Sequence, residues 1–81
     1  MNTQLNPAKN NATIILDQFS DKQVEVNLIN ILGTKVSELF SGVPVNSQEI
    51  PVELRAFDKG IYFVQVISGG DVIVTDKLLV E

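Results

Sequence analysis

The sequence predicts an all-β fold, a small antiparallel immunoglobulin-like β-sandwich of about six to seven strands. The first reason is a period of two, because Val24, Val26 and Leu28 alternate with polar residues as in a strand with one buried face. The second is the spacing of turn residues, which interrupt the chain at intervals of roughly ten residues. The third is that no stretch keeps the apolar spacing of three and four that an amphipathic helix requires.

The chain divides into a short leading segment and one domain. Residues 1–6 are rich in Asn and poor in large apolar side chains, so we expect a linker remnant or a loosely held N-terminal arm. Residues 7–81 form the expected β-sandwich. With 81 residues and 44% hydrophobic content, the chain is too short for a second folded domain.

Each expected strand is bounded by turn chemistry. The expected strands cover residues 13–17, 24–28, 35–40, 48–53, 60–68 and 71–81. Pro51 cannot donate to a ladder and places its strand at a sheet edge, whereas residues 60–68 are apolar on both parities and predict a central strand covered on both faces. A single helical turn near residues 54–58 is the one expected exception to the strands.

Two turns and one misplaced charge refine this prediction. Gly33 can take the positive φ of a reversal between two strands, and the Gly69–Gly70 pair predicts a two-residue hairpin. Asp76 falls on the inward parity of the last strand, beside Val74 and Leu78. It is either a functional carboxylate or, as we favour, the mark of a bulge or of an edge strand protected by an inward charge.

Composition argues against most chemical functions. The chain has no Cys and no His, so we expect no metal and no cofactor. The net charge is −4 and the basic residues are dispersed, which argues against nucleic acid as a partner. The longest apolar run, Ile61 to Val64, is far shorter than the roughly 20 residues that span a bilayer, so we expect no membrane insertion.

Any catalysis would have to depend on carboxylates, Lys, Tyr, or Ser and Thr without an imidazole base. Asp17 with Asp21, or Glu49 with Glu53, could be paired acids or oxygen ligands for calcium. Neither pair has the dense spacing of a calcium loop, and we favour solvated strand faces and turns. The prediction is that the protein is not an enzyme.

In their order, four groups of residues resemble the type A C-terminal sorting domain of the type IX secretion system. Residues 6–10 resemble the Asn-Pro opening of that family, and residues 24–36 resemble its strand, Asn-hydrophobic-hydrophobic-Gly turn and following strand. Residues 54–66 resemble its Gly-hydrophobic-Tyr strand. The chain ends on Lys77 and a short apolar run, residues 78–80, as members of the family do.

The resemblance implies a function as well as a fold. A domain of this family is an immunoglobulin-like sandwich at the end of a larger passenger protein and crosses the periplasm on its way to the outer membrane, the cell surface or the medium. Its implied partners are the passenger, the outer-membrane translocon that recognises it, and a sortase-like peptidase that removes it.

The resemblance also assigns recognition residues: Gly33, Val36, Gly60, Tyr62 and Lys77. The two glycines would set backbone turns, the tyrosine would display an aromatic ring from a rigid strand, and the lysine would place a charge beside a final strand able to add to a partner sheet.

The chain departs from the family pattern at two places. Residues 4–5 stand where an aromatic-Pro pair often precedes the Asn-Pro opening, and the acidic Asp76 stands before Lys77, where basic or polar residues are frequent.

The main alternative is a fibronectin-like adhesion or carbohydrate-binding module. Such modules usually stack sugar rings on exposed Trp or Tyr, and this chain has no Trp and one Tyr on a presumed central strand. A dimer through unpaired edge strands is also a possibility that the sequence leaves open.

Overall fold

The structure is a computed structural model that describes residues 2–5, 11–19 and 21–81, with side chains from residue 11 onward. Within these residues seven strands form two antiparallel sheets, which confirms the predicted β-sandwich. The smaller sheet has the order β1-β2-β5, formed by Asn2–Leu5, Asn11–Leu16 and Gln48–Glu53. The larger has the order β4-β3-β6-β7, formed by Lys35–Gly42, Val24–Asn30, Gly60–Ser68 and Asp71–Val80.

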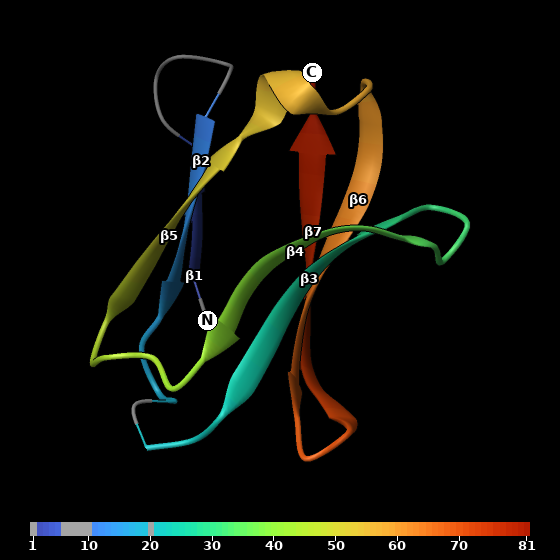
Figure 1. The fold of residues 1–81 in the computed structure, drawn as a ribbon. Coiled ribbons are helices and arrows are strands. Elements are labelled where there is room, and N and C mark those ends of the chain that lie inside the picture. The colour runs from blue at the N-terminus through green and yellow to red at the C-terminus, as the bar shows by residue number, and fades with distance from the viewer. Residues whose placement is uncertain (1, 6–10, 20) are drawn as a thin grey trace.

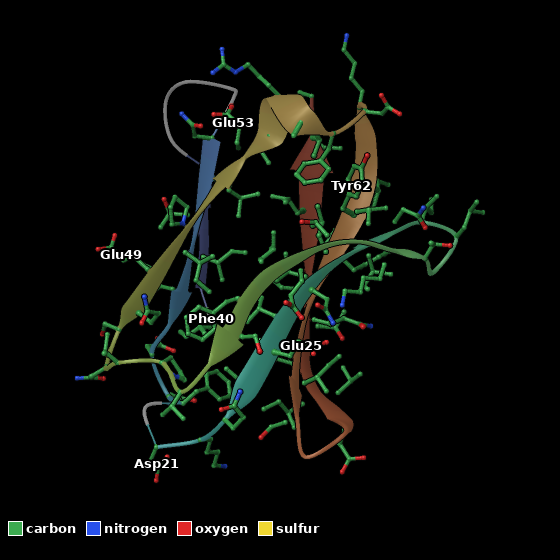
Figure 2. All side chains as sticks on the ribbon, in the orientation of Figure 1. Asp21, Glu25, Phe40, Glu49, Glu53 and Tyr62 are labelled. Carbon is green, nitrogen blue, oxygen red and sulfur yellow. The ribbon has the colours of Figure 1, made fainter. Side chains whose placement is uncertain are left out.

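The two sheets face each other across a single apolar core (Figure 1). Alternation within the strands supplies this core, since Ile14 and Leu16 point inward from β2 while Val24, Val26 and Leu28 do so from β3. Phe40, on β4, packs against the same cluster (Figure 2). The predicted helical turn is present as the 3-10 helix Leu54–Ala56, which leads from β5 towards β6.

Strand β6 lies between β3 and β7, as predicted, but the expectation that both its faces are covered is wrong. Tyr62, Val64 and Val66 point into the core, whereas Ile61 and Phe63 are only half-buried on the outer face. Apolar residues on both parities therefore do not mean two buried faces here. They leave the outer face of the larger sheet partly apolar.

The edges of the sheets hold the residues that the sequence assigned to edges. Pro51 lies on β5, an edge strand of the smaller sheet. Asp76 lies half-buried on the edge strand β7, in agreement with the interpretation of Asp76 as an inward charge on an edge strand. The bulge of this strand lies three residues earlier, at Ile73, where the pairing of β7 with β6 shifts by one residue.

The leading segment differs from the expectation of a linker remnant or loose arm. Asn2–Leu5 forms β1, which pairs in regular antiparallel register with β2 from Asn2↔Ile15 to Leu5↔Ala12. Backbone pairing places few demands on side-chain identity, so a polar segment can add to a sheet edge without an apolar pattern that would predict it. The Asn-Pro motif at residues 6–10 lies outside the described residues.

The hairpin turns follow the predicted chemistry. Gly69 and Gly70 have φ of 61° and 84°, the paired positive values of a two-residue hairpin that joins β6 to β7. The Ser68 hydroxyl donates to the backbone oxygen of Gln23 at 3.0 Å and ties this hairpin to the start of β3.

No helix in the described part of the chain is long and apolar enough to cross a membrane.

Candidate functional site

The β3–β4 hairpin is a rigid turn with an apolar tip. The Asn30 side-chain oxygen accepts hydrogen bonds from the backbone N–H groups of Leu32 at 3.0 Å and Thr34 at 2.9 Å. Gly33, with φ of 87°, donates its N–H to the Asn30 backbone oxygen at 2.9 Å. These bonds fix the turn while leaving Ile31 and Leu32 68% and 86% exposed. Two large apolar side chains are thus held in solvent by a well-bonded backbone.

Substitution of Gly33 by valine is expected to lower the free energy of unfolding by about 1–3 kcal/mol, because a β-branched residue is strained at positive φ. A Cβ at this position would meet no other atom within 4 Å, so the cost is conformational rather than steric. Urea unfolding measures it. Gly33→Asn, which tolerates this φ better, is the control and should lose clearly less; equal losses would contradict this account.

Val36 lies at a bulge of β4, because the register passes from Leu28↔Ser37 to Ile29↔Lys35 and leaves it unpaired. Its side chain is 41% exposed. The bulge and the hairpin tip belong to one end of the β3–β4 ribbon. Gly33 and Val36 are therefore neighbours at a single edge of the larger sheet.

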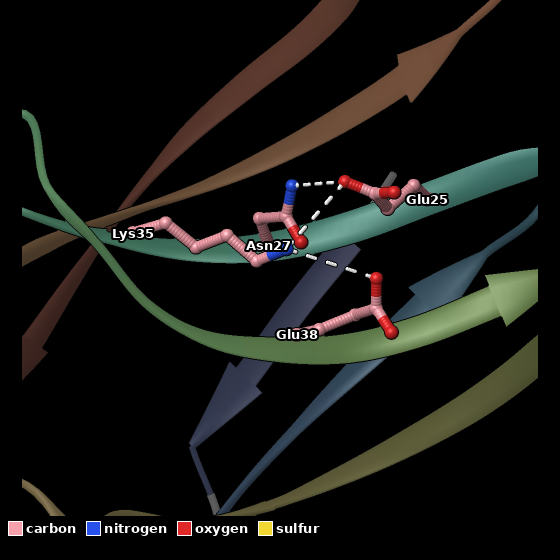
Figure 3. A network of polar contacts seen from close by, with 4 residues as sticks. All are labelled: Glu25, Asn27, Lys35 and Glu38. Atoms are coloured by element: carbon pink, nitrogen blue, oxygen red, sulfur yellow. Dashed lines mark hydrogen bonds and ion pairs between the residues drawn. The ribbon is translucent and has the colours of Figure 1, made fainter.

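A polar network covers the outer face beside this bulge (Figure 3). The Lys35 ammonium lies 3.8 Å from a Glu25 carboxylate oxygen and 3.7 Å from one of Glu38, and the Asn27 amide nitrogen donates to Glu25 at 2.6 Å. Asn27 is only 3% exposed, and within the described residues its side-chain oxygen has no hydrogen-bond partner. Asn27 has the parity of the solvated face of its strand, so the alternation of residues predicts exposure where the structure shows burial.

Tyr62 does not display its ring, so the role that the resemblance implied for it is wrong in that respect. The side chain is 8% exposed, and its ring centroid lies 6.0 Å from that of Phe57. Its hydroxyl donates to the backbone oxygen of Asp58 at 2.7 Å. Tyr62 thereby fixes the segment that leads into Gly60, whose φ of 151° begins β6. The ring of Tyr62 therefore packs inside the domain.

Lys77 is exposed on β7 and belongs to the outer face of the larger sheet. The register Ile29↔Phe63↔Lys77 places it in one row with two half-buried apolar residues of the central strands. In the neighbouring row Leu79, 48% exposed, lies opposite Ile61. The lysine therefore borders an apolar part of the outer face.

The five predicted recognition residues do not form one compact site. Gly33 and Val36 lie at the β4 edge of the larger sheet, Lys77 lies at its β7 edge, and Gly60 and Tyr62 lie on the central strand between them. What they share is the larger sheet, whose two edges carry the exposed members. Ile31 and Leu32 are exposed candidates that the sequence motif did not single out, although two consecutive apolar residues in a turn are a visible signal.

Of the acids that the sequence offered as pairs, Glu49 and Glu53 both lie exposed on β5. Figure 2 shows Glu49 and Glu53 near opposite ends of β5 and Asp21 in the loop after β2. Among the described residues, no group of three or more acidic side chains gathers closely enough to hold a metal ion. Glu53 instead accepts a hydrogen bond from the Arg55 side chain at 2.9 Å, which lowers the pKa of this carboxyl.

Because the pKa of Glu53 is lower in the folded state, its contribution to stability is present above the unfolded-state pKa and is lost as the pH falls through the folded-state pKa. Both side chains are exposed, so solvent screens the pair and we expect only a slight change of stability in Arg55→Ala. NMR titration of Glu53 should show its pKa rising in that variant. An unchanged Glu53 titration would contradict the pairing.

A protein-family model described as a secretion system C-terminal sorting domain matches residues 6–81. This chain belongs to that family. The match covers almost the whole chain and includes both edges of the larger sheet. No curated protein and no solved structure matches the sorting domain.

Membership confirms the resemblance to type IX secretion sorting domains. A sorting domain of this kind works linked to an N-terminal passenger and together with secretion machinery, and it sends its passenger to the outer membrane or the cell surface. The family suggests a non-enzymatic role. The burial of Tyr62 argues against the carbohydrate-binding alternative, because the single Tyr of the chain provides no exposed platform for stacking a sugar ring.

Proposed function

We propose that this domain carries its passenger through the periplasm to the type IX translocon, is recognised there, and is then removed by a sortase-like peptidase. The observation that supports recognition by this chain is the hairpin of β3 and β4, which holds Ile31 and Leu32 in solvent on a hydrogen-bonded turn inside the region matched by the family. A rigid apolar tip loses little conformational entropy when it enters a pocket.

The recognition residues divide into two roles in this proposal. Val36 and Lys77 are exposed and would contact the translocon directly. Gly33, Gly60 and Tyr62 would act as positioning residues, because the glycines set positive φ values and the tyrosine is buried. Substitution of the positioning residues should impair recognition only as far as it disturbs the fold.

The test fuses the domain to a fluorescent passenger with a Sec signal, in a bacterium with a working type IX system and in a strain without the translocon. We expect surface fluorescence in the first strain and periplasmic retention in the second. Retention in both strains would overturn the sorting function and favour an adhesion module.

A matched pair of variants tests the hairpin tip. Ile31 and Val45 are 68% and 66% exposed, and they lie in different loops. Ile31→Ser should reduce surface display severalfold, whereas Val45→Ser should leave it unchanged, and neither should alter stability by more than about 0.5 kcal/mol. Equal display by the two variants would exclude the hairpin tip from recognition.

A further inference from the structure

Strand β7 has an open edge, since the larger sheet ends there in the described structure. The Lys77 N–H donates to the Asp76 side-chain oxygen at 3.0 Å, which shows that this amide points away from β6. Hydrogen bonding alternates along an antiparallel strand, so the backbone groups of Thr75 and Leu79 face the same open edge. From Val74 to Val80 the register with β6 has no shift. The edge is therefore seven residues of regular strand with no neighbouring strand among the described residues.

The other sheet edges in the described structure are less suited to strand pairing. Strand β4 carries two register shifts, which leave Val36 and Leu39 unpaired and break the line of donors and acceptors. Strand β5 contains Pro51, which has no N–H. Strand β1 has four residues. The β7 edge is the longest regular one that the described chain offers.

We infer that the open edge of β7 binds an extended strand of the secretion machinery by strand addition, with Asp76 covering the central amide until that strand arrives. This inference depends on the proposed sorting function and names how recognition occurs. Main-chain pairing would provide the affinity, while Lys77 and Leu79 on the outer face would select a strand with an acidic and an apolar side chain opposite them.

A second copy of the domain is a poorer occupant of this edge. The antiparallel register that uses all of Val74 to Val80 is centred on Lys77, so a symmetric pair would place two lysines directly opposite each other. Asp76, half-buried on the inner side of the same edge, adds an inward charge of the kind that discourages indiscriminate pairing. The edge is therefore protected against self-association and remains available to a strand of complementary charge.

Proline and alanine at the same position separate the backbone from the side chain. Lys77→Ala removes the charge and keeps the edge N–H, whereas Lys77→Pro removes both; Thr75→Ala and Thr75→Pro form a second pair. Because these amides face the open edge and not β6, Thr75→Pro should unfold at the same urea concentration as Thr75→Ala, and Lys77→Pro should lose only the exposed hydrogen bond to Asp76 relative to Lys77→Ala. In the passenger fusion described above, each proline variant should be displayed at least tenfold less than its alanine partner.

The possible outcomes are distinct. Absence of display for the unsubstituted fusion would overturn the sorting function itself. Normal display of that fusion with equal display of the proline and alanine variants would overturn strand addition alone. A large loss of stability in both proline variants would also overturn it, because these amides would then pair with β6 and not face the open edge. A β7-linked dimer of the isolated domain in sedimentation would assign the edge to a second copy instead.

The role of Asp76 as a cover is tested separately by amide hydrogen exchange. Asp76→Ala should speed exchange at the Lys77 amide severalfold, while Asp76→Asn, which keeps an acceptor oxygen, should stay close to the unsubstituted rate. The amide of Leu78, which faces β6, serves as the internal reference. Unchanged exchange at Lys77 in Asp76→Ala would overturn this part of the inference.

Discussion

Replacing Tyr62 by alanine is expected to lower the free energy of unfolding by about 3–5 kcal/mol, because it empties a buried site next to Phe57 in the core. Replacing it by phenylalanine keeps the ring and removes only the hydrogen bond to the Asp58 backbone oxygen, at a cost of about 1 kcal/mol. Chemical unfolding of the isolated domain measures both changes.

The two substitutions also decide how Tyr62 contributes to sorting. If the tyrosine contributes mainly through the packing of its buried ring, then Tyr62→Phe should be displayed on the cell surface nearly as well as the unsubstituted fusion, and Tyr62→Ala should fail because its fold is lost. Phe57→Leu, which alters the neighbouring ring without touching the hydroxyl, is the control. Poor display of a stably folded Tyr62→Phe would show instead that sorting requires the hydroxyl and its hydrogen bond to the segment before Gly60.

The alternation of residues along β6 predicts which residues share a face with Tyr62, but it does not predict which face is buried. Tyr62 shares its parity with Val64 and Val66, and this pattern predicts a common face. Which of the two apolar faces is covered by the second sheet depends on the register between strands, and Ile61 and Phe63 look equally suitable for burial in sequence. The structure resolves this by placing the even-numbered face inward.

Other features were readable in sequence because they depend on local chemistry. The turn at Gly33 and the hairpin at Gly69–Gly70 need positive φ, which glycine adopts without strain, and Pro51 can occupy an edge strand at little cost. The burial of Asn27 depends on the side chains that strand pairing places around it. The hydrogen bond from the Lys77 amide to Asp76 depends on β7 being the open edge of the sheet. Such features require the three-dimensional arrangement, and no periodicity encodes them.

Leu28 and Leu32 provide the sharpest separation of folding from recognition. Leu28 is fully buried on β3, and four residues later Leu32 is 86% exposed at the hairpin tip. Leu28→Ala should lower the free energy of unfolding by about 3 kcal/mol, whereas Leu32→Ala should change it by less than about 0.5 kcal/mol. A domain of 81 residues has a total stability of only about 4–12 kcal/mol, so the first change is a large fraction of it.

The effects of Leu28→Ala and Leu32→Ala on export should have the opposite order when both variants are folded. At a temperature where Leu28→Ala remains folded, its surface display should match that of the unsubstituted fusion, because no exposed group has changed. Leu32→Ala should be displayed severalfold less at every temperature, since it removes an apolar contact from the tip while the turn held by Asn30 stays intact. Normal display of Leu32→Ala would restrict recognition to the β7 side of the larger sheet.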